Sequence, residues 1–511
     1  MLRATLALAT CALAACAVPS GTTARPPNVL IVLADDLGYG DPRCYNDESK
    51  IPTPRMDALA AEGLRFTDAH APASVCSPTR YGILTGRYAW RGRLQRGVLM
   101  PLDPPLIEPE LETLPELLRQ RGYRSACIGK WHLGWDWPLK DGGHVSDVFA
   151  GVGMDLDARM ALMPRIDFTR RVRGGPLAHG FDEYFGDDVP NHPPYAFIDG
   201  DRLVTQPTAM NDAELYGHDG PMSPGWDDSM VLPTLAQRAA SWLDEHARQA
   251  DPRPFFLYFA LTSPHTPIAP STRWRGVSQA GAYGDYVAET DWALGVVLDA
   301  VARNGFAEDT LVVFCSDNGS PRFDGEGMQG EPDAVIARYG HDPSRPWRGR
   351  KGELYEGGHR VPLLLRWPRV VTGPAVADRL VSLTDLYRTI ANLGGAKPAP
   401  GSGEDSLDLL PLLRGANDDA HARGSIVHHA SNGTFGFRSG TWKLLEERVI
   451  EELPDGAGSR ETVVQRLFDL AGDPGESIDL AAERPELVAR LREEFEIVRL
   501  GRGTAGHHVP R

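Results

Sequence analysis

Four stretches of continuous apolar residues constrain the fold of this chain more than any other feature. They cover residues 28–34, 125–129, 255–261 and 310–316. A strand buried on one face alternates apolar and polar residues, whereas a strand covered on both faces is apolar throughout. Helical patterns lie between them, at residues 54–63, 114–121, 232–248 and 283–304. The sequence therefore predicts a large three-layer α/β/α domain with a central mixed sheet.

Polar side chains follow each apolar stretch at the point where the strand should end. They are Asp35 and Asp36, Lys130 and His132, His265, and Asp317 and Asn318. Any single pair has an ordinary explanation, because Asp often caps a helix and Lys or His often lies in a solvated loop. Ligands of open α/β sheets bind outside the carboxyl ends of the strands, so four such ends together indicate a site. Carboxylate and amide oxygens suit Ca²⁺ or Mg²⁺ rather than zinc.

The pentapeptide Cys-Ser-Pro-Thr-Arg at residues 76–80 lies between a polar loop and an apolar run. Pro78 fits the first turn of a helix, which places Cys76 at or just before a helix N-terminus. Backbone amides and the helix dipole favour a bound anion there. Arg80 lies one turn later and would place a fixed cation beside the thiol. Alone, the pattern also fits a small buried cysteine before a capped helix.

Together with the strand ends, this pentapeptide resembles the signature of formylglycine-dependent sulfatases of the arylsulfatase type, in the alkaline phosphatase superfamily. The resemblance extends from Asn28 to a Phe-Asp-Leu segment and the Asp-Pro-Gly-Glu that follows it, within residues 468–476. The other matching segments are residues 34–41, 84–87, 129–134, 179–182, 263–265, 316–319, 351–352 and 356–358. No position expected in direct contact with the substrate or the metal is missing from the pattern.

The resemblance implies a role for each of these residues. A maturation enzyme would convert Cys76 to 3-oxoalanine (formylglycine), whose hydrate attacks sulfur. One Ca²⁺ per chain would be bound by Asp35, Asp36, Asp317, Asn318 and the modified Cys76. The other implied roles are a cation that steadies the hydrate (Arg80), sulfate binding (Lys130 and Lys351), protonation of the leaving group (His265) and a base at the second hydroxyl (His132).

The implied reaction is hydrolysis of sulfate esters. Aromatic and arginine side chains in loops at residues 135–230 and 320–350 favour a sulfated carbohydrate over a simpler sulfated small molecule. The candidate contacts are His192, Trp347, Arg348 and Arg350. One alternative is a phosphonate monoester or phosphodiester hydrolase of the same superfamily, although an Asp-His pair and softer metals would then be expected at residues 317–318. Another is a non-catalytic lipoprotein that binds sulfated glycans.

The first sixteen residues predict a signal peptide. Arg3 precedes an apolar run, residues 4–15, that is too short to span a bilayer. The run ends in Leu-Ala-Ala-Cys, which resembles a bacterial lipobox and predicts a lipid anchor at Cys16. We expect an exported periplasmic or outer-membrane lipoprotein; a plain secretory signal would instead give a cell-surface or extracellular protein. The net charge of −16 argues against nucleic acid as a partner.

A chain of 511 residues is too long for one small core. We predict a catalytic domain over residues 26–396 and a small C-terminal α+β subdomain with an antiparallel sheet over residues 397–511. Short strand patterns at residues 425–429, 435–439, 442–447 and 467–470 precede a helical pattern at residues 484–498. Cys127 and Cys315 lie in apolar runs and should be buried, whereas the sequence leaves Cys44 either free or paired.

Overall fold

The computed structural model describes most of the chain after residue 24. The described ranges are residues 25–149, 151–153, 156–211, 217–250, 253–324, 332–415, 422–452 and 459–501. The predicted signal and lipobox, residues 1–16, lie outside them. In the part of the chain that is described, no helix has both the length and the apolar character needed to cross a membrane.

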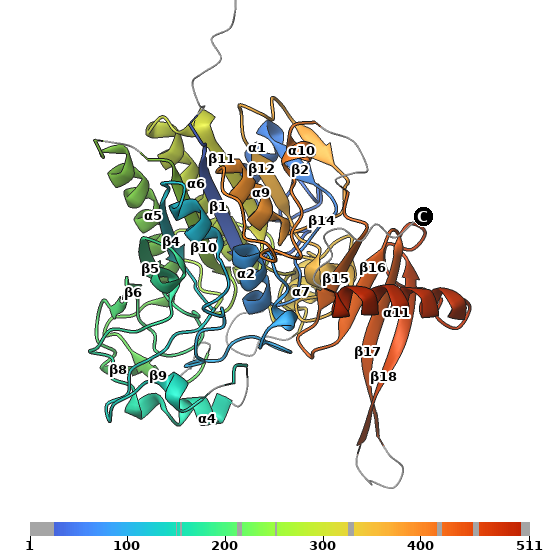
Figure 1. Ribbon diagram of the computed structural model, residues 1–511, viewed down its shortest axis with the longest axis horizontal. Helices are drawn as coiled ribbons and strands as arrows, with labels where there is room; N and C mark the ends of the chain where they lie inside the picture. The colour runs from blue at the N-terminus through green and yellow to red at the C-terminus, as the bar shows by residue number, and fades with distance from the viewer. Residues whose placement is uncertain are drawn as a thin grey trace, which may run out of the picture.

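A ten-stranded mixed sheet runs through the larger part of the molecule (Figure 1), in the order β13-β2-β12-β11-β1-β10-β4-β5-β6-β7. The four predicted strands lie side by side at its centre: β11 (Thr310–Ser316), β1 (Asn28–Asp35), β10 (Phe255–Pro264) and β4 (Arg124–Gly129). These four are parallel to one another, and every residue in them is buried. Beside β11, the strand β12 (Leu363–Arg366) is antiparallel and makes the sheet mixed. The remaining strands of this sheet are β13 (Ala375–Ala377), β2 (Leu64–Phe66), β5 (Glu183–Gly186), β6 (Ile198–Asp199) and β7 (Arg202–Leu203).

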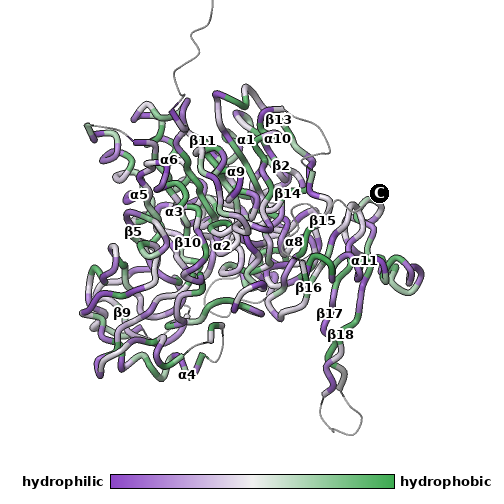
Figure 2. The backbone as a smooth tube through the Cα atoms, in the orientation of Figure 1, coloured by the Kyte–Doolittle hydropathy of each residue, from purple (hydrophilic) through white to green (hydrophobic). Residues whose placement is uncertain are grey.

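Helices cover both faces of this sheet, which confirms the three-layer prediction. Alternate residues of β1 enter different cores: Ile31 belongs to one apolar cluster and Leu30 to the other. The first cluster includes residues of α2 (Cys76–Thr85), α3 (Leu114–Arg119) and α9 (Asp385–Leu393). The second includes residues of α1 (Pro54–Glu62), α5 (Val231–Ala247) and α6 (Gly281–Arg303). Figure 2 shows hydrophobic residues gathered along the central strands and the helices packed on them.

A separate antiparallel sheet of four strands lies near the C-terminus, as predicted. Its strands are β15 (Ser425–His429), β16 (Phe435–Ser439), β17 (Trp442–Glu452) and β18 (Ser459–Asp469). The helix α11 (Pro485–Leu500) lies across this sheet (Figure 1) and adds Phe495 to a small core with Val427 and Leu467. The β17–β18 hairpin is longer than predicted. Its outer parts are mostly exposed and mix charged residues with Ile450 and Val463, so the sequence shows no buried face there.

The region 135–235, which we predicted as loops, also contains regular structure. Its strand β5 pairs in parallel with β4, and β6 and β7 extend the edge of the main sheet. Strands of two to four residues are too short to show a period, which explains the error. The other short elements of the chain are β3 (Ala69–His70), β14 (Val381–Ser382), β8 (Ala209–Asn211), β9 (Gly220–Met222), α4 (Leu156–Met160), α7 (Ala334–Tyr339), α8 (Glu356–His359) and α10 (Leu410–Leu413).

Candidate active site

The ends of the four central strands meet at one edge of the sheet and bring the predicted polar side chains together. Lys130, directly after β4, donates from Nζ to Oδ2 of Asp35 over 2.6 Å. Asn318, just beyond β11, donates from Nδ2 to Oδ1 of Asp36 over 2.7 Å. All four side chains are buried. The sequence expectation that these strand ends form one cluster is confirmed by these contacts.

Helix α2 adds Arg80 to the cluster. Its Nε and Nη2 both donate to Oδ2 of Asp317, over 3.0 and 2.8 Å. Its Nη1 donates to the backbone carbonyl of Lys130 over 2.9 Å. The helix begins at Cys76, as the position of Pro78 predicted, so thiol and guanidinium are carried by one rigid element. Arg80 thereby fixes the start of α2 against the ends of β4 and β11.

Each lysine of the site contacts a different aspartate. Lys351 lies between β11 and α8 in sequence, and its Nζ is 2.7 Å from Oδ1 and 2.8 Å from Oδ2 of Asp36. Burial opposes a charge on Lys130, but the carboxylate of Asp35 raises the pKa of this lysine above its ordinary value. Lys130 therefore remains an ammonium in the interior, where fixed charges act strongly on a bound anion.

Two oxygen atoms of the cluster are left without hydrogen bonds. Oδ1 of Asp35 and Oδ1 of Asn318 are buried and accept none from the described residues. One ligand atom from each of Asp35, Asp36, Cys76 and His265 lies within 4.8 Å of the others. Burial and then the neighbouring Asp35 raise the pKa of Asp317 to about 7, because a second carboxylate charge is unfavourable in this buried group. Unpartnered hard oxygens among crowded carboxylates fit a cation such as Ca²⁺.

The two predicted histidines differ in how their ring nitrogens are engaged. Nε2 of His132 donates to the carbonyl of Leu99 over 3.1 Å, while its buried Nδ1 has no partner in the described chain. Burial, and then Lys130, lowers the pKa of His132, so its Nδ1 carries a free lone pair. Nδ1 of His265 donates to the carbonyl of Thr266 over 2.5 Å, and its Nε2 is 3.8 Å from Oδ2 of Asp36. Burial and then Lys351 lower the pKa of His265 to about 4.

Cys76 is itself buried, with 1% of its surface exposed. Burial raises the pKa of its thiol to about 12, in spite of the neighbouring Lys130. The encoded side chain is therefore a protonated thiol at neutral pH, which is a weak nucleophile. The predicted core positions of Cys127 and Cys315 are confirmed, and Cys44 is free.

A fifth strand end contributes acids that the sequence analysis missed. Asp187 and Asp188 follow β5, and burial raises the pKa of each to about 7. Oδ1 of Asp188 accepts a hydrogen bond from the backbone N–H of His132 over 3.2 Å, which places these acids against the site. An Asp-Asp pair after a strand, as at Asp35, could have revealed these acids in the sequence. It was missed because β5 has only four residues and shows no strand pattern.

Three of the four predicted contacts at the pocket mouth have partners within the chain instead. Arg350 donates to Asp333 over 3.1 Å and to Asp342 over 3.0 Å. The guanidinium of Arg348 lies 3.8 Å from the ring centroid of Tyr355, and that of Arg360 lies 3.8 Å from the ring centroid of Trp347.

The fourth predicted contact, His192, is close to the catalytic charges. Its ring centroid is 4.9 Å from that of His218. Burial lowers the pKa of His192, and the charges of His218 and His265 lower it further. This pair of imidazoles is consequently the best-placed part of the predicted pocket mouth, and His218 gave no signal in the sequence.

The fold and the strand-end cluster together define a member of the alkaline phosphatase superfamily. Within it, the chain belongs to the sulfatase family: the family model described as Sulfatase matches residues 27–396. The chain is 30% identical to an N-acetylgalactosamine-6-O-sulfatase of Bacteroides thetaiotaomicron, covering 94% of each protein. It is 34% identical to human arylsulfatase A, covering 92% of this chain and 87% of that protein.

A solved structure from work on the metabolism of multiple glycosaminoglycans by B. thetaiotaomicron has the same fold. Its TM-score is 0.77 at 26% identity, and the match covers 94% of this chain and all of that one. The sequence-based recognition of the family is thus confirmed. The protein is a sulfatase, an enzyme that hydrolyses sulfate esters.

Proposed function

We propose that this sulfatase acts on a sulfated carbohydrate, through a formylglycine made from Cys76 and with one Ca²⁺ bound at the strand ends. The observation that carries the proposal is the pair of unpartnered buried oxygens, on Asp35 and Asn318, beside Cys76 at the start of α2. Asp36 and Asp317 would complete the protein ligands of the cation. When present, the hydrate supplies the attacking hydroxyl, and Ca²⁺ lowers its pKa and polarises the sulfate.

The cationic side chains bind and orient the anionic ester. Lys130 approaches the cluster from the end of β4 and Lys351 from the loop before α8, and each would contact a sulfate oxygen. Because both are already held by aspartates, they need little reorganisation as charge develops on the sulfate group. Arg80, bound to Asp317, fixes the first turn of α2 so that residue 76 keeps its place relative to sulfur.

The two histidines would move the protons. A free lone pair on Nδ1 of His132 can accept a proton from residue 76, while Nε2 is fixed by the carbonyl of Leu99. His265 would protonate the leaving alcohol from Nε2 as an imidazolium, because in the neutral ring the single N–H is on Nδ1 and donates to the carbonyl of Thr266. The bound anionic ester would have to raise the low pKa of this ring for it to carry the second proton. Asp188 would act as a positioning residue, because it accepts the backbone N–H of His132.

A sulfated sugar is favoured over a simple aryl sulfate for two reasons. The relative from B. thetaiotaomicron is named for 6-O-sulfated N-acetylgalactosamine, and it matches over nearly the full length of both chains. The imidazole of His192 adds a polar group near His265, where the alcohol portion of the ester would lie, and His218 lies beside His192. We therefore expect sulfated mono- and disaccharides, with 6-O-sulfated amino sugars as the first to test.

A turnover assay separates this proposal from its alternatives. Purified enzyme would be offered 4-nitrophenyl sulfate, 4-nitrophenyl phenylphosphonate and a panel of defined sulfated sugars. We expect the highest kcat/KM on one of the sulfated sugars and measurable turnover of the aryl sulfate. A preference for the phosphonate would support the phosphonate hydrolase, and binding of sulfated glycans without turnover would support the non-catalytic lipoprotein.

We also propose that the protein is exported and lipidated at Cys16. The support is the order of the first residues alone: Arg3, an apolar run and Leu-Ala-Ala-Cys. Metabolic labelling with a clickable fatty acid should mark the wild type and not Cys16→Ala. Labelling of both proteins, or of neither, would contradict a lipid anchor at this residue.

A further inference from the structure

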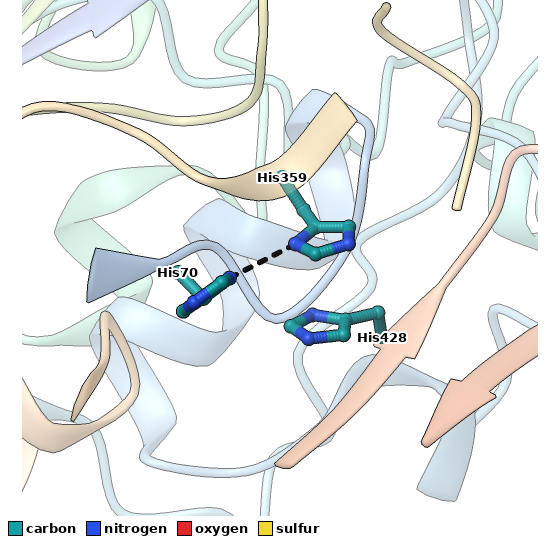
Figure 3. A group of neighbouring side chains, drawn as sticks. All are labelled: His70, His359 and His428. Atoms are coloured by element: carbon teal, nitrogen blue, oxygen red, sulfur yellow. Dashed lines mark hydrogen bonds between the residues drawn. The ribbon is translucent and has the colours of Figure 1, made fainter. Parts of the chain in front are cut away.

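Three buried histidines form a second cluster at the junction of the main sheet and the C-terminal sheet. His70 ends β3, His359 ends α8 and His428 lies in β15 (Figure 3). Each side chain is fully buried, with no exposed surface. None of the three belongs to the strand-end cluster, so the sulfatase reaction leaves them unexplained.

The contact between His70 and His359 raises a hydrogen-bonding problem. Nε2 of His70 lies 2.9 Å from Oδ1 of Asp68, and Nε2 of His359 lies 3.0 Å from the carbonyl of Leu354. When each Nε2 donates to its acceptor, a neutral ring keeps a lone pair on Nδ1. The two Nδ1 atoms face each other at 3.0 Å, as the dashed line in Figure 3 marks. Two lone pairs at this distance need a cation between them, either a metal ion or a proton.

The partners of Asp68 support the assignment at His70, whereas His359 has two neighbours that compete for Nε2. Both oxygens of Asp68 accept from the guanidinium of Arg438, each over 2.8 Å, so this group is the acceptor for Nε2 of His70. The ammonium of Lys443 donates to Oε1 of Glu356 over 2.8 Å and forms an ion pair with Glu476 at 2.8 Å, and its Nζ is also 3.2 Å from Nε2 of His359. An ammonium has three N–H groups, so Nε2 of His359 can also accept from Lys443; its Nδ1 would then carry a proton and donate to Nδ1 of His70. The proposed metal takes the place of that proton.

His428 supplies a third donor with no other use. Neither of its ring nitrogens has a hydrogen-bond partner among the described residues, although the side chain is fully buried. Its ring stacks on that of His359 with centroids 3.5 Å apart, and one nitrogen lies within 4.8 Å of a nitrogen of each other histidine. A buried imidazole without hydrogen bonds destabilises the folded state, and a ligand bound to one of its nitrogens would remove that cost. Because the stacked planes are parallel, His428 must turn about its side-chain bonds to bind a shared ion.

We propose that this cluster binds a divalent transition-metal cation of the zinc class through Nδ1 of His70, Nδ1 of His359 and a ring nitrogen of His428. Imidazole suits Zn²⁺, Ni²⁺ or Cu²⁺ and is a poor ligand for Ca²⁺. A metal-binding histidine commonly donates its other N–H to a carboxylate or a backbone carbonyl. Asp68 does this for His70, and the carbonyl of Leu354 does it for His359.

The position of the cluster indicates what the metal would stabilise. The strand β3 leads into the loop before Cys76, and α8 follows the loop that carries Lys351. Backbone hydrogen bonds already join these segments to each other and to β15: the N–H of Ala71 donates to His359, and the N–H of Ser74 donates to His429. A metal bound to all three histidines would hold the C-terminal sheet against both catalytic loops.

The test is metal analysis of the full-length enzyme. Protein stripped of metal would be dialysed against excess Ca²⁺, which fills the strand-end cluster, together with a small excess of Zn²⁺. We expect elemental analysis to find about one zinc per chain, and X-ray absorption to show nitrogen ligands at about 2.0–2.1 Å. His359→Asn should lose this zinc. The matched control is His429→Asn, since His429 adjoins His428 in β15 but binds the carbonyl of Gln95 outside the cluster.

Each outcome either supports or overturns the site. Zinc retained by His429→Asn and lost by His359→Asn supports it. A wild type without zinc would mean that the two Nδ1 atoms share a proton. Zinc with oxygen or sulfur ligands and at most one imidazole, from His265, would place it at the strand ends. If His359→Asn does not fold, the X-ray absorption spectrum of the wild type alone decides between these results.

Discussion

The strand-end cluster and the histidine cluster are both buried and both leave ligand atoms unpartnered, but they are built in opposite ways. The first gathers oxygens and ammonium groups at the ends of adjacent parallel strands. The second gathers ring nitrogens from β3, α8 and β15, which are far apart in sequence. Oxygen ligands indicate a hard cation, and nitrogen ligands indicate a softer one. We infer from this difference that the main sheet positions the catalytic side chains, whereas the histidine cluster stabilises the loops that lead to Cys76 and Lys351.

The largest effect should follow from removing a carboxylate of the strand-end cluster. Asp317→Ala should abolish turnover and destabilise the fold by about 3–5 kcal/mol, because the buried guanidinium of Arg80 loses its partner. Activity assays and thermal denaturation would measure both. Asp317→Asn, which keeps the shape, separates loss of charge from loss of packing, and Asp324→Ala is a control at a buried acid outside the cluster. Substantial turnover by Asp317→Ala would break the assignment of the cluster.

A smaller and selective effect is expected at His265. His265→Ala should lower kcat on sugar sulfates by roughly 10²–10⁴-fold, because a poor leaving group needs a proton. An activated aryl sulfate needs less protonation, so its loss should be much smaller. The measurement is kcat of the wild type and of His265→Ala on a sugar sulfate and on 4-nitrophenyl sulfate. Equal losses on the two classes would count against His265 as the acid.

The sequence predicted the first cluster well because its physical signals are local. A fully apolar strand followed by Asp35 or Asp317 can be seen within ten residues, and parallel strands bring their ends together. Asp187 was missed because β5 is too short to show a pattern. The histidine cluster gave no local signal at all, since β3 has two residues and each partner comes from a different segment. Tertiary structure alone brings His70 and His428 together.

His132 offers a way to sharpen the comparison between the two catalytic histidines. His132→Ala should still release the first equivalent of nitrophenol from 4-nitrophenyl sulfate quickly, and then turn over slowly. The reason is that His132 is assigned to regeneration of the enzyme and His265 to departure of the alcohol. Stopped-flow absorbance would reveal the burst. A uniform slowing without a burst would contradict this division of roles.

The smallest effect on turnover should follow from removing zinc from the histidine cluster. A nitrogen-donor chelator selective for zinc over calcium, added in excess Ca²⁺, should lower the melting temperature and leave turnover near its starting value. Zinc at a hundred times its Kd stabilises a folded state by about 2.7 kcal/mol, so its removal should be measurable by scanning calorimetry. A complete loss of turnover with no change in melting temperature would reverse the roles assigned to the two clusters.

Cys76 carries the central claim, and peptide mass spectrometry of the active enzyme tests it most directly. The account predicts an aldehyde in place of the thiol at residue 76, with turnover proportional to the converted fraction. Cys76→Ala should fold and show no turnover, and Pro78→Ala should lower conversion with little change in the fold. Fully active enzyme whose peptide carries only the unmodified Cys76 thiol would contradict the mechanism.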